Sequence, residues 1–84
     1  MNVTLTIEAR AQLEDLTLAV QRRIGALLRR LADWPAVSGA KPLRGELAGQ
    51  FRLRTGDYRV QFHVRGREVV VTRIGHRDGF YDEN

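Results

Sequence analysis

The sequence contains no cysteine, only two prolines and a single lysine among its 84 residues. Without cysteine, the chain can form neither a disulfide framework nor a cysteine-ligated zinc site, which fits a reducing cytoplasm. No apolar run approaches the roughly 20 residues that a membrane-spanning helix needs. Acidic residues at Glu8, Glu14 and Asp15 argue against a secretory signal peptide. We therefore expect a cytoplasmic protein that does not associate with membranes.

Positive charge is concentrated in one block of the chain. Residues 1–40 carry five basic and four acidic side chains, whereas residues 41–77 carry nine basic and three acidic ones. Thirteen of the fourteen cations are arginine, which makes planar two-point contacts to phosphate and stacks on nucleobases. The block indicates a surface for a polyanion, RNA first of all. The alternative is a solvated surface in a protein whose genome favours arginine codons.

The apolar spacing predicts one α+β domain over residues 1–84, in the order β-α-α-β-β-β. Alternation over residues 2–6 predicts a strand, and Thr6 is placed to cap the helix that follows. A second helical stripe ends at Trp34-Pro35, because proline disfavours helix at the preceding residue. After an irregular stretch over residues 35–49, residues 50–54, 58–64 and 67–74 read as strands joined by short turns. We expect the helical hairpin to pack on this small antiparallel sheet.

Three arginines are expected to converge on the exposed face of that sheet. Arg52 and Arg54 are two residues apart on one strand, so their side chains share a face. Arg59 belongs to the next strand, at one of the alternate positions whose side chains are expected to be exposed. Clustered like charges repel, so the cluster destabilises the free protein unless an anion binds there. We expect Arg77 to share this concave surface. The alternative is a solvated face on which the arginines splay apart.

The segment after the last predicted strand holds His76, Arg77 and Tyr81. Functional side chains are often carried by such segments, because a rigid sheet holds them in place. A tyrosine ring can stack on a splayed RNA base, although a tyrosine near a chain end is more often a packing residue. His63 is expected at the surface, and His76 is expected to orient a neighbour or to pack.

The second half of the sequence contains an ordered set of motifs: Leu43-Arg44-Gly45, Phe51-Arg52-Leu53-Arg54, Gly56-Asp57-Tyr58-Arg59-Val60, Arg73-Ile74-Gly75-His76-Arg77 and Tyr81. Together these motifs resemble the RelE/ParE toxin superfamily, and most closely its RelE branch. The resemblance spans essentially the whole chain and implies a RelE-like microbial RNase fold. It also implies the toxin of a type II toxin-antitoxin system, a ribosome-dependent endoribonuclease (an mRNA interferase). Such a toxin cuts mRNA in the ribosomal A site by attack of a 2′-hydroxyl on the adjacent phosphate, without metal or cofactor.

The resemblance further implies roles for residues at matching positions. Arg59 would hold the phosphate, Arg77 would assist the leaving oxygen, and Tyr81 would stack on the substrate base. Arg52 and Arg54 stand where RelE proteins often have lysines, one of which is proposed as the proton acceptor. Arginine stays protonated and makes a poor base, so the chain offers no obvious general base there. The remaining residues expected to bind RNA are Lys41, Arg44, Arg73 and His76.

Other functions stay open from the sequence. One is a ParE-like toxin that inhibits DNA gyrase by binding it, a second is an inactive nucleic-acid-binding relative, and a third is a ribosome-independent nuclease. Both toxin interpretations, the endoribonuclease and the gyrase inhibitor, imply an antitoxin with an acidic, amphipathic segment. The endoribonuclease interpretation adds mRNA and the ribosome as partners, and we expect the free toxin to be monomeric. Val69 and Val71 share parity with Arg73, so we expect them either to form an apolar groove for the antitoxin or to lie under the C-terminal tail.

Overall fold

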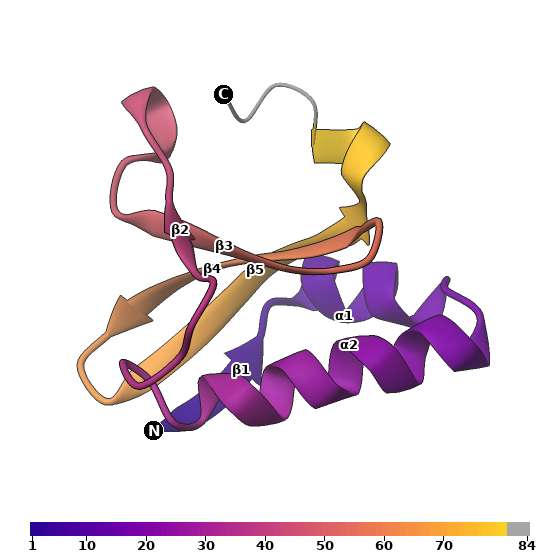
Figure 1. The fold of residues 1–84 in the computed structure, drawn as a ribbon, viewed down its shortest axis with the longest axis horizontal. Coiled ribbons are helices and arrows are strands. Elements are labelled where there is room, and N and C mark those ends of the chain that lie inside the picture. Colours follow the sequence, from indigo (N-terminus) through magenta and orange to yellow (C-terminus); the bar gives the residue numbers. More distant parts are fainter. Residues whose placement is uncertain (81–84) are drawn as a thin grey trace.

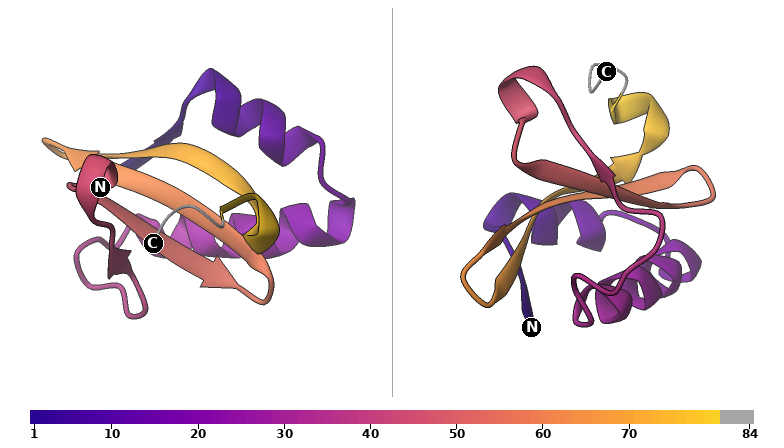
Figure 2. Two further views of the ribbon diagram at one scale, coloured as in Figure 1. Left: turned by 90° about the horizontal axis from the view of Figure 1, so that it is seen from above. Right: turned by 60° about the vertical axis from the view of Figure 1, so that its left-hand side comes forward.

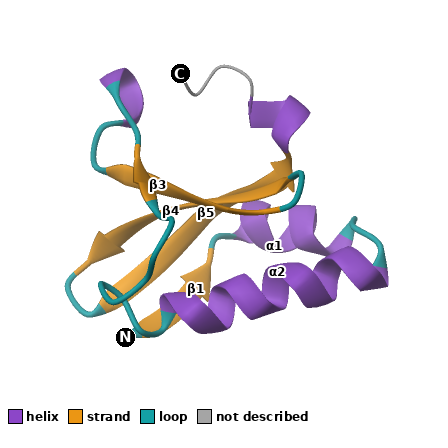
Figure 3. Cartoon of the chain, viewed as in Figure 1, coloured by secondary structure: helices purple, strands orange, loops and turns teal. Residues whose placement is uncertain are grey.

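The computed structural model describes residues 1–80 and shows two helices packed on one face of a five-stranded mixed sheet (Figures 1 and 3). The strands are β1 (Asn2–Leu5), β2 (Lys41–Pro42), β3 (Gln50–Thr55), β4 (Tyr58–Arg65) and β5 (Glu68–His76). The helices are α1 (Ile7–Glu14) and α2 (Leu18–Leu31), and the short 3-10 helices are η1 (Gly45–Leu47) and η2 (Arg77–Phe80). The predicted α+β class is confirmed.

Each α-helix begins at a threonine that caps it. The hydroxyl oxygen of Thr6 accepts a 3.1 Å hydrogen bond from the N–H of Ala9, and that of Thr17 accepts a 3.3 Å bond from the N–H of Val20. Such caps satisfy N–H groups that have no partner within the helix. The predicted cap at Thr6 is therefore confirmed. Within residues 1–80, no helix has the length and apolarity needed to cross a membrane.

The sheet has the strand order β1-β5-β4-β3-β2. The pairs β2–β3, β3–β4 and β4–β5 are antiparallel, as the short turns predicted, but β1 pairs with β5 in parallel. The expectation of a purely antiparallel sheet was therefore wrong. No hairpin joins β1 to β5, so no turn signal in the sequence fixes their relative direction. The two-residue strand β2 lies within the stretch that was expected to be irregular.

The core lies between the helices and one face of the sheet. The buried side of α2 presents Ile24, Leu27 and Leu31, which join sheet residues such as Leu53 and Phe62 in one apolar cluster. The remaining buried members of this cluster are Ala9, Val60, Val69, Val71 and Ile74. Within residues 1–80, α1 and α2 leave the other face of the sheet uncovered (Figure 2).

An irregularity in β5 changes which residues share a face. Phe62 pairs with Val71, but Gln61 pairs with Arg73, so Thr72 is an extra residue in the ladder. Such a β-bulge shifts the alternation of the strand by one position. Val71 and Val69 are therefore fully buried in the core, and both the expected apolar groove and the expected position under the tail were wrong.

Candidate functional site

The open face is the side of the sheet that α1 and α2 do not cover. Figure 1 shows η1 and η2 rising from this side at opposite ends, and Figure 2 shows the same arrangement from two further directions. The strands β3, β4 and β5 form the floor between them. Side chains on this floor are therefore flanked by raised segments on two sides.

Two arginines face each other across the β3–β4 hairpin on the open face. Arg54 and Arg59 are direct cross-strand partners, and the two residues between their strands, Gly56 and Asp57, form the turn. Directly opposed side chains have Cβ atoms about 4.5–5.5 Å apart, and like charges so placed destabilise the pair. The register thus brings Arg54 and Arg59 to one face, as the alternation predicted.

A second row crosses four strands next to this pair. Lys41 of β2 is opposite Arg52 of β3, Arg52 is opposite Gln61 of β4, and Gln61 is opposite Arg73 of β5. Neighbouring strands are about 4.8 Å apart, so the cations flank a single neutral residue. We call these four residues the cationic row. At their open-face positions on β3 and β4, the described strands place no aspartate or glutamate beside it.

The neutral residue of the cationic row belongs to a polar cluster. The Nε2 group of Gln61 donates a 2.9 Å hydrogen bond to Oε1 of Gln50, and the hydroxyl of Thr72 donates to the same oxygen at 3.1 Å. Gln61 is only 5% exposed, and its own Oε1 has no hydrogen-bond partner. Sequence reasoning missed this cluster. A glutamine at an open-face position between two arginine-bearing strands was the signal available.

Arg77 lies at the rim of the open face, in η2. Its main-chain N–H donates a 2.7 Å hydrogen bond to the carbonyl oxygen of Asp57 in the β3–β4 turn. Its guanidinium lies 3.9 Å from a carboxylate oxygen of Asp57 and 3.9 Å from one of Asp78, and its side chain is 59% exposed. A second contact holds η2, because the Arg73 guanidinium donates to the carbonyl oxygen of Gly79.

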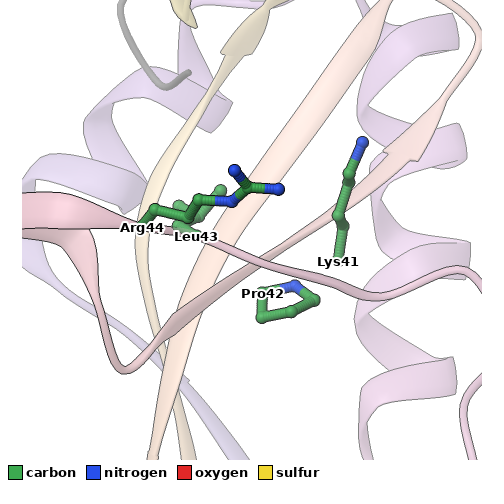
Figure 4. A pocket seen from close by; sticks show the side chains of 4 residues that line it. All are labelled: Lys41, Pro42, Leu43 and Arg44. Carbon is green, nitrogen blue, oxygen red and sulfur yellow. The ribbon is translucent and has the colours of Figure 1, made fainter.

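Lys41 and Arg44 line a cavity of about 340 Å³ together with Pro42 and Leu43. In Figure 4 the Arg44 guanidinium extends into the space on the side where Lys41 stands. Both residues are exposed, and Arg44 immediately precedes η1. Of these two expected RNA-binding residues, Arg44 therefore extends the cationic row beyond Lys41 toward η1.

The structure separates the two histidines. His63 pairs with Gln50 and Val70, next to the cationic row on the open face. His76 pairs instead with Tyr58, on the helix-covered side of the sheet, and its ring meets the Tyr58 ring edge-on at 5.2 Å. The Nδ1 atom of His76 also accepts a 3.2 Å hydrogen bond from the main-chain N–H of Asp78 and lies 3.4 Å from the Asp78 carboxylate, which Arg77 contacts as well. His76 therefore lies beside Arg77 at the rim and not in the cationic row. Tyr81, expected to stack on a base, lies outside the described residues.

The arrangement can hold a chain of negative charges and stabilise charge that develops on it. Fixed cations act most strongly when the fold positions them before the anion arrives. Residues 1–80 contain no group of three histidine or acidic side chains able to hold a metal ion. The described side chains that this face offers are arginine, lysine, His63 and neutral hydrogen-bonding groups.

Comparison with known proteins identifies the family. A family model described as the ParE toxin of the type II toxin-antitoxin system parDE matches residues 3–79. The chain belongs to the RelE/ParE superfamily of toxins. A curated member of this superfamily, Toxin RelG from Mycobacterium tuberculosis, is 44% identical over 43 residues, a segment that spans 49% of this chain and 49% of that relative.

Solved structures of RelE/ParE toxins share the fold. The toxin-antitoxin complex RelBE2 of Mycobacterium tuberculosis contains a chain that is 31% identical, with a TM-score of 0.80 and 90% of each chain covered. The isolated Escherichia coli RelE toxin gives a TM-score of 0.75 at 19% identity, covering 89% of this chain and 82% of that one. The predicted RelE-like fold is thus confirmed, and the chain is a type II toxin of the RelE/ParE superfamily.

Proposed function

We propose that this toxin is a RelE-like endoribonuclease that cleaves mRNA in the ribosomal A site. The observation that carries the proposal is the set of cations on the open face, with the Arg54–Arg59 pair beside the cationic row. Arg77 adds a further guanidinium at the rim. An uncovered sheet face with this charge fits the backbone of a single RNA strand.

The chemistry proposed is attack of a ribose 2′-hydroxyl on the adjacent phosphate. The O2′–P bond forms as the P–O5′ bond breaks, which leaves a cyclic phosphate and a 5′-hydroxyl. Arg59 would hold the phosphate, and Arg77 would stabilise charge on the departing oxygen. Cations positioned around such a transition state supply most of the catalysis of phosphoryl transfer.

Proton transfer is where this chain departs from its RelE relatives. Arg52 and Arg54 stand at positions where the resemblance leads us to expect lysine, and arginine remains protonated throughout the physiological range. We propose that both arginines act as electrostatic groups. His63 lies on the same face, where it pairs with Gln50 next to the cationic row, whereas the His76 ring packs against the Tyr58 ring.

The proposal includes an antitoxin partner in the cytoplasm. Several solved relatives of this fold are toxin-antitoxin complexes, among them RelBE2 of Mycobacterium tuberculosis and the RelB-RelE complex of Methanococcus jannaschii. An acidic, amphipathic antitoxin segment would neutralise the cations of the open face and so block access of RNA. Free toxin is proposed to be monomeric.

A second candidate function is inhibition of DNA gyrase. The observation that favours it is the family model, whose description is that of a ParE toxin. In that case the arginines of the open face would contact a protein partner, and no RNA would be cut.

The two candidates are separated by a cell-free translation reaction with the purified protein. Primer extension on the mRNA would map cleavage, and supercoiling by purified gyrase would be measured in parallel. The variants are Arg77→Ala and, as a matched control, Arg65→Ala, which removes an exposed arginine at the far end of β4. We expect A-site cuts that require ribosomes, that weaken with Arg77→Ala and that persist with Arg65→Ala.

Two results would count against the endoribonuclease. Loss of supercoiling without mRNA cuts would favour the gyrase candidate. Equal cutting by Arg77→Ala and the wild type would show that Arg77 takes no part in the reaction. The proposed arrangement of the site would then be wrong.

A further inference from the structure

The proposed cleavage needs a group that takes the proton of the attacking hydroxyl, and the arginines of the open face do not supply one. Arginine remains protonated throughout the physiological range. The sequence holds two histidines, of which His76 lies at the rim beside Arg77. The other, His63, lies on the floor of the open face, between Gln50 of β3 and Val70 of β5.

The imidazole of His63 is available to a ligand. The residue is half-buried in the central strand β4, and within residues 1–80 its side chain makes no hydrogen bond or ion pair. The charged residues around it come from three strands. Arg52 lies diagonally across the ladder on β3, Arg65 is two positions further along β4, and Glu68 of β5 is paired with Arg65 at 3.6 Å. The carboxylate of Glu68 is therefore engaged by a neighbour other than His63.

The register places His63 at one end of a line of functional groups. Side chains on one face of a strand repeat every two residues, so Arg59 lies two open-face positions from His63, and Arg52 lies opposite the position between them. Arg52 is thus a diagonal neighbour of both, at about 7–8 Å. Arg77 lies past Arg59, where its main chain contacts the β3–β4 turn. The order along the open face is therefore His63, Arg52, Arg59 and Arg77.

We propose that the imidazole of His63 is the proton acceptor of the cleavage reaction and takes its proton from the ribose 2′-hydroxyl. This inference rests on the proposed function, since it completes the reaction proposed there. In an in-line displacement the attacking and departing oxygens lie on opposite sides of the phosphorus. Arg52 and Arg59 occupy the middle of the line, where they would hold the phosphate. His63 is then on the attacking side and Arg77 on the departing side.

Neutral imidazole can carry out this step because one of its ring nitrogens has no proton. That nitrogen takes the proton of the 2′-hydroxyl as the O2′–P bond forms and the P–O5′ bond breaks. The departing O5′ keeps the electron pair of the broken bond, is stabilised by Arg77 and takes a proton from water. His63 then returns its proton to water. Histidine suits this cycle because its charge changes between about pH 5 and 8.

Single-turnover cleavage on preassembled ribosomes tests this assignment. Ribosomes that carry mRNA with a vacant A site are mixed with a saturating amount of toxin, and primer extension follows the cuts from about pH 5.5 to 8. The wild type is compared with His63→Gln, which keeps a polar side chain that accepts no proton. Arg65→Ala is the matched control, because it removes an exposed side chain two positions along the same strand.

We expect His63→Gln to lower the single-turnover rate at neutral pH by about 10²–10⁴-fold, the usual contribution of a general base. The toxin concentration that gives half the maximal rate should change little, and Arg65→Ala should behave as the wild type. The wild-type rate should rise with pH and level off once the imidazole is neutral. Without His63 the proton goes to hydroxide, so the rate of His63→Gln should rise through the whole range without levelling off.

A second variant separates chemistry from structure. His63→Ala should regain part of its rate when free imidazole is added to the reaction, because the added base can take the same proton. A purely structural role of the side chain would not give this rescue. Urea denaturation of both variants would show that they fold.

Four outcomes would overturn the inference. Cuts by the wild type that His63→Gln makes at the same rate would remove the proton acceptor and leave the endoribonuclease standing. A loss confined to the half-maximal concentration would make His63 an RNA contact, and unfolded variants without imidazole rescue would make it a structural residue. If the wild type makes no cuts at all, the endoribonuclease proposal fails, and the proton acceptor fails with it.

Discussion

The main-chain N–H of Arg77 donates a 2.7 Å hydrogen bond to the carbonyl oxygen of Asp57. This bond joins η2 to the β3–β4 turn, two segments that are twenty positions apart in the sequence. It uses backbone atoms, so the position of Arg77 does not depend on its side chain. The side-chain pair between the two residues is long, at 3.9 Å, and largely exposed, and exposed pairs contribute about 0–1 kcal/mol to stability.

Arg77→Ala should therefore separate activity from stability. We expect the free energy of unfolding to change by less than about 0.5 kcal/mol, as for most exposed sites. Cleavage in translation reactions should fall by about 10²–10³-fold, the effect of losing one well-placed donor to the transition state. Urea denaturation and primer extension on the same preparations would measure both. A drop in stability above about 1 kcal/mol would show that the side chain is structural.

Arg54→Gln should stabilise the free protein. The substitution removes a like charge directly opposite Arg59, and such cross-strand terms amount to about 0.2–1 kcal/mol. The gain should shrink at about 1 M salt, where the Debye length falls to about 3 Å. Denaturation at low and high salt would measure the difference. Arg65→Gln is the control, because it removes a charge that faces Glu68 at 3.6 Å and should bring no gain at low salt.

Gln61→Met and Gln50→Met should differ in stability although they remove the same group. Gln61→Met removes an oxygen that is already buried without a partner, which offsets the loss of one hydrogen bond worth about 1 kcal/mol. Gln50→Met leaves the Nε2 group of Gln61 without its acceptor, at a cost of about 1–3 kcal/mol. Urea denaturation of both variants would test this. If Gln61→Met is the more destabilising of the two, its oxygen has a structural role in the free protein.

Gly56→Ala should cost more stability than Gly66→Ala. Both glycines have positive φ, at 59° and 62°, where a Cβ atom costs about 1–2 kcal/mol. At Gly56 the added atom would also clash with Nη2 of Arg23, whereas nothing lies within 4 Å at Gly66. The additional loss of stability in Gly56→Ala should be small, since a guanidinium at the end of a flexible side chain can move. It should vanish when both glycine variants are made in an Arg23→Ala background, and an excess that persists there would have another origin.

The sequence predicted the open face better than it predicted the sheet. Alternation within the β3–β4 hairpin placed Arg52, Arg54 and Arg59 on one side, because a short turn fixes both the register and the direction of its strands. The bulge at Thr72 carries no comparable local signal. It was the reason that the parity argument failed for Val69 and Val71, which are buried.

Long-range pairings were the other part that the sequence did not predict. The parallel contact between β1 and β5 joins Val3 to Val69, and no turn composition encodes it. Gln61 was missed for a related reason. Its importance comes from the strands on both sides of it and from its bond to Gln50, which become visible only once the register is known.

The strand order has a consequence for how the protein is made. The strand β5 lies inside the sheet between β1 and β4. The first strand, β1, therefore cannot pair with its neighbour until Glu68–His76 have been synthesised. Contacts between such distant segments form late and slow the folding of small domains. Arg73 also arrives only with β5. A nascent chain therefore completes its core and the surface proposed to hold RNA in one step, when β5 has been synthesised.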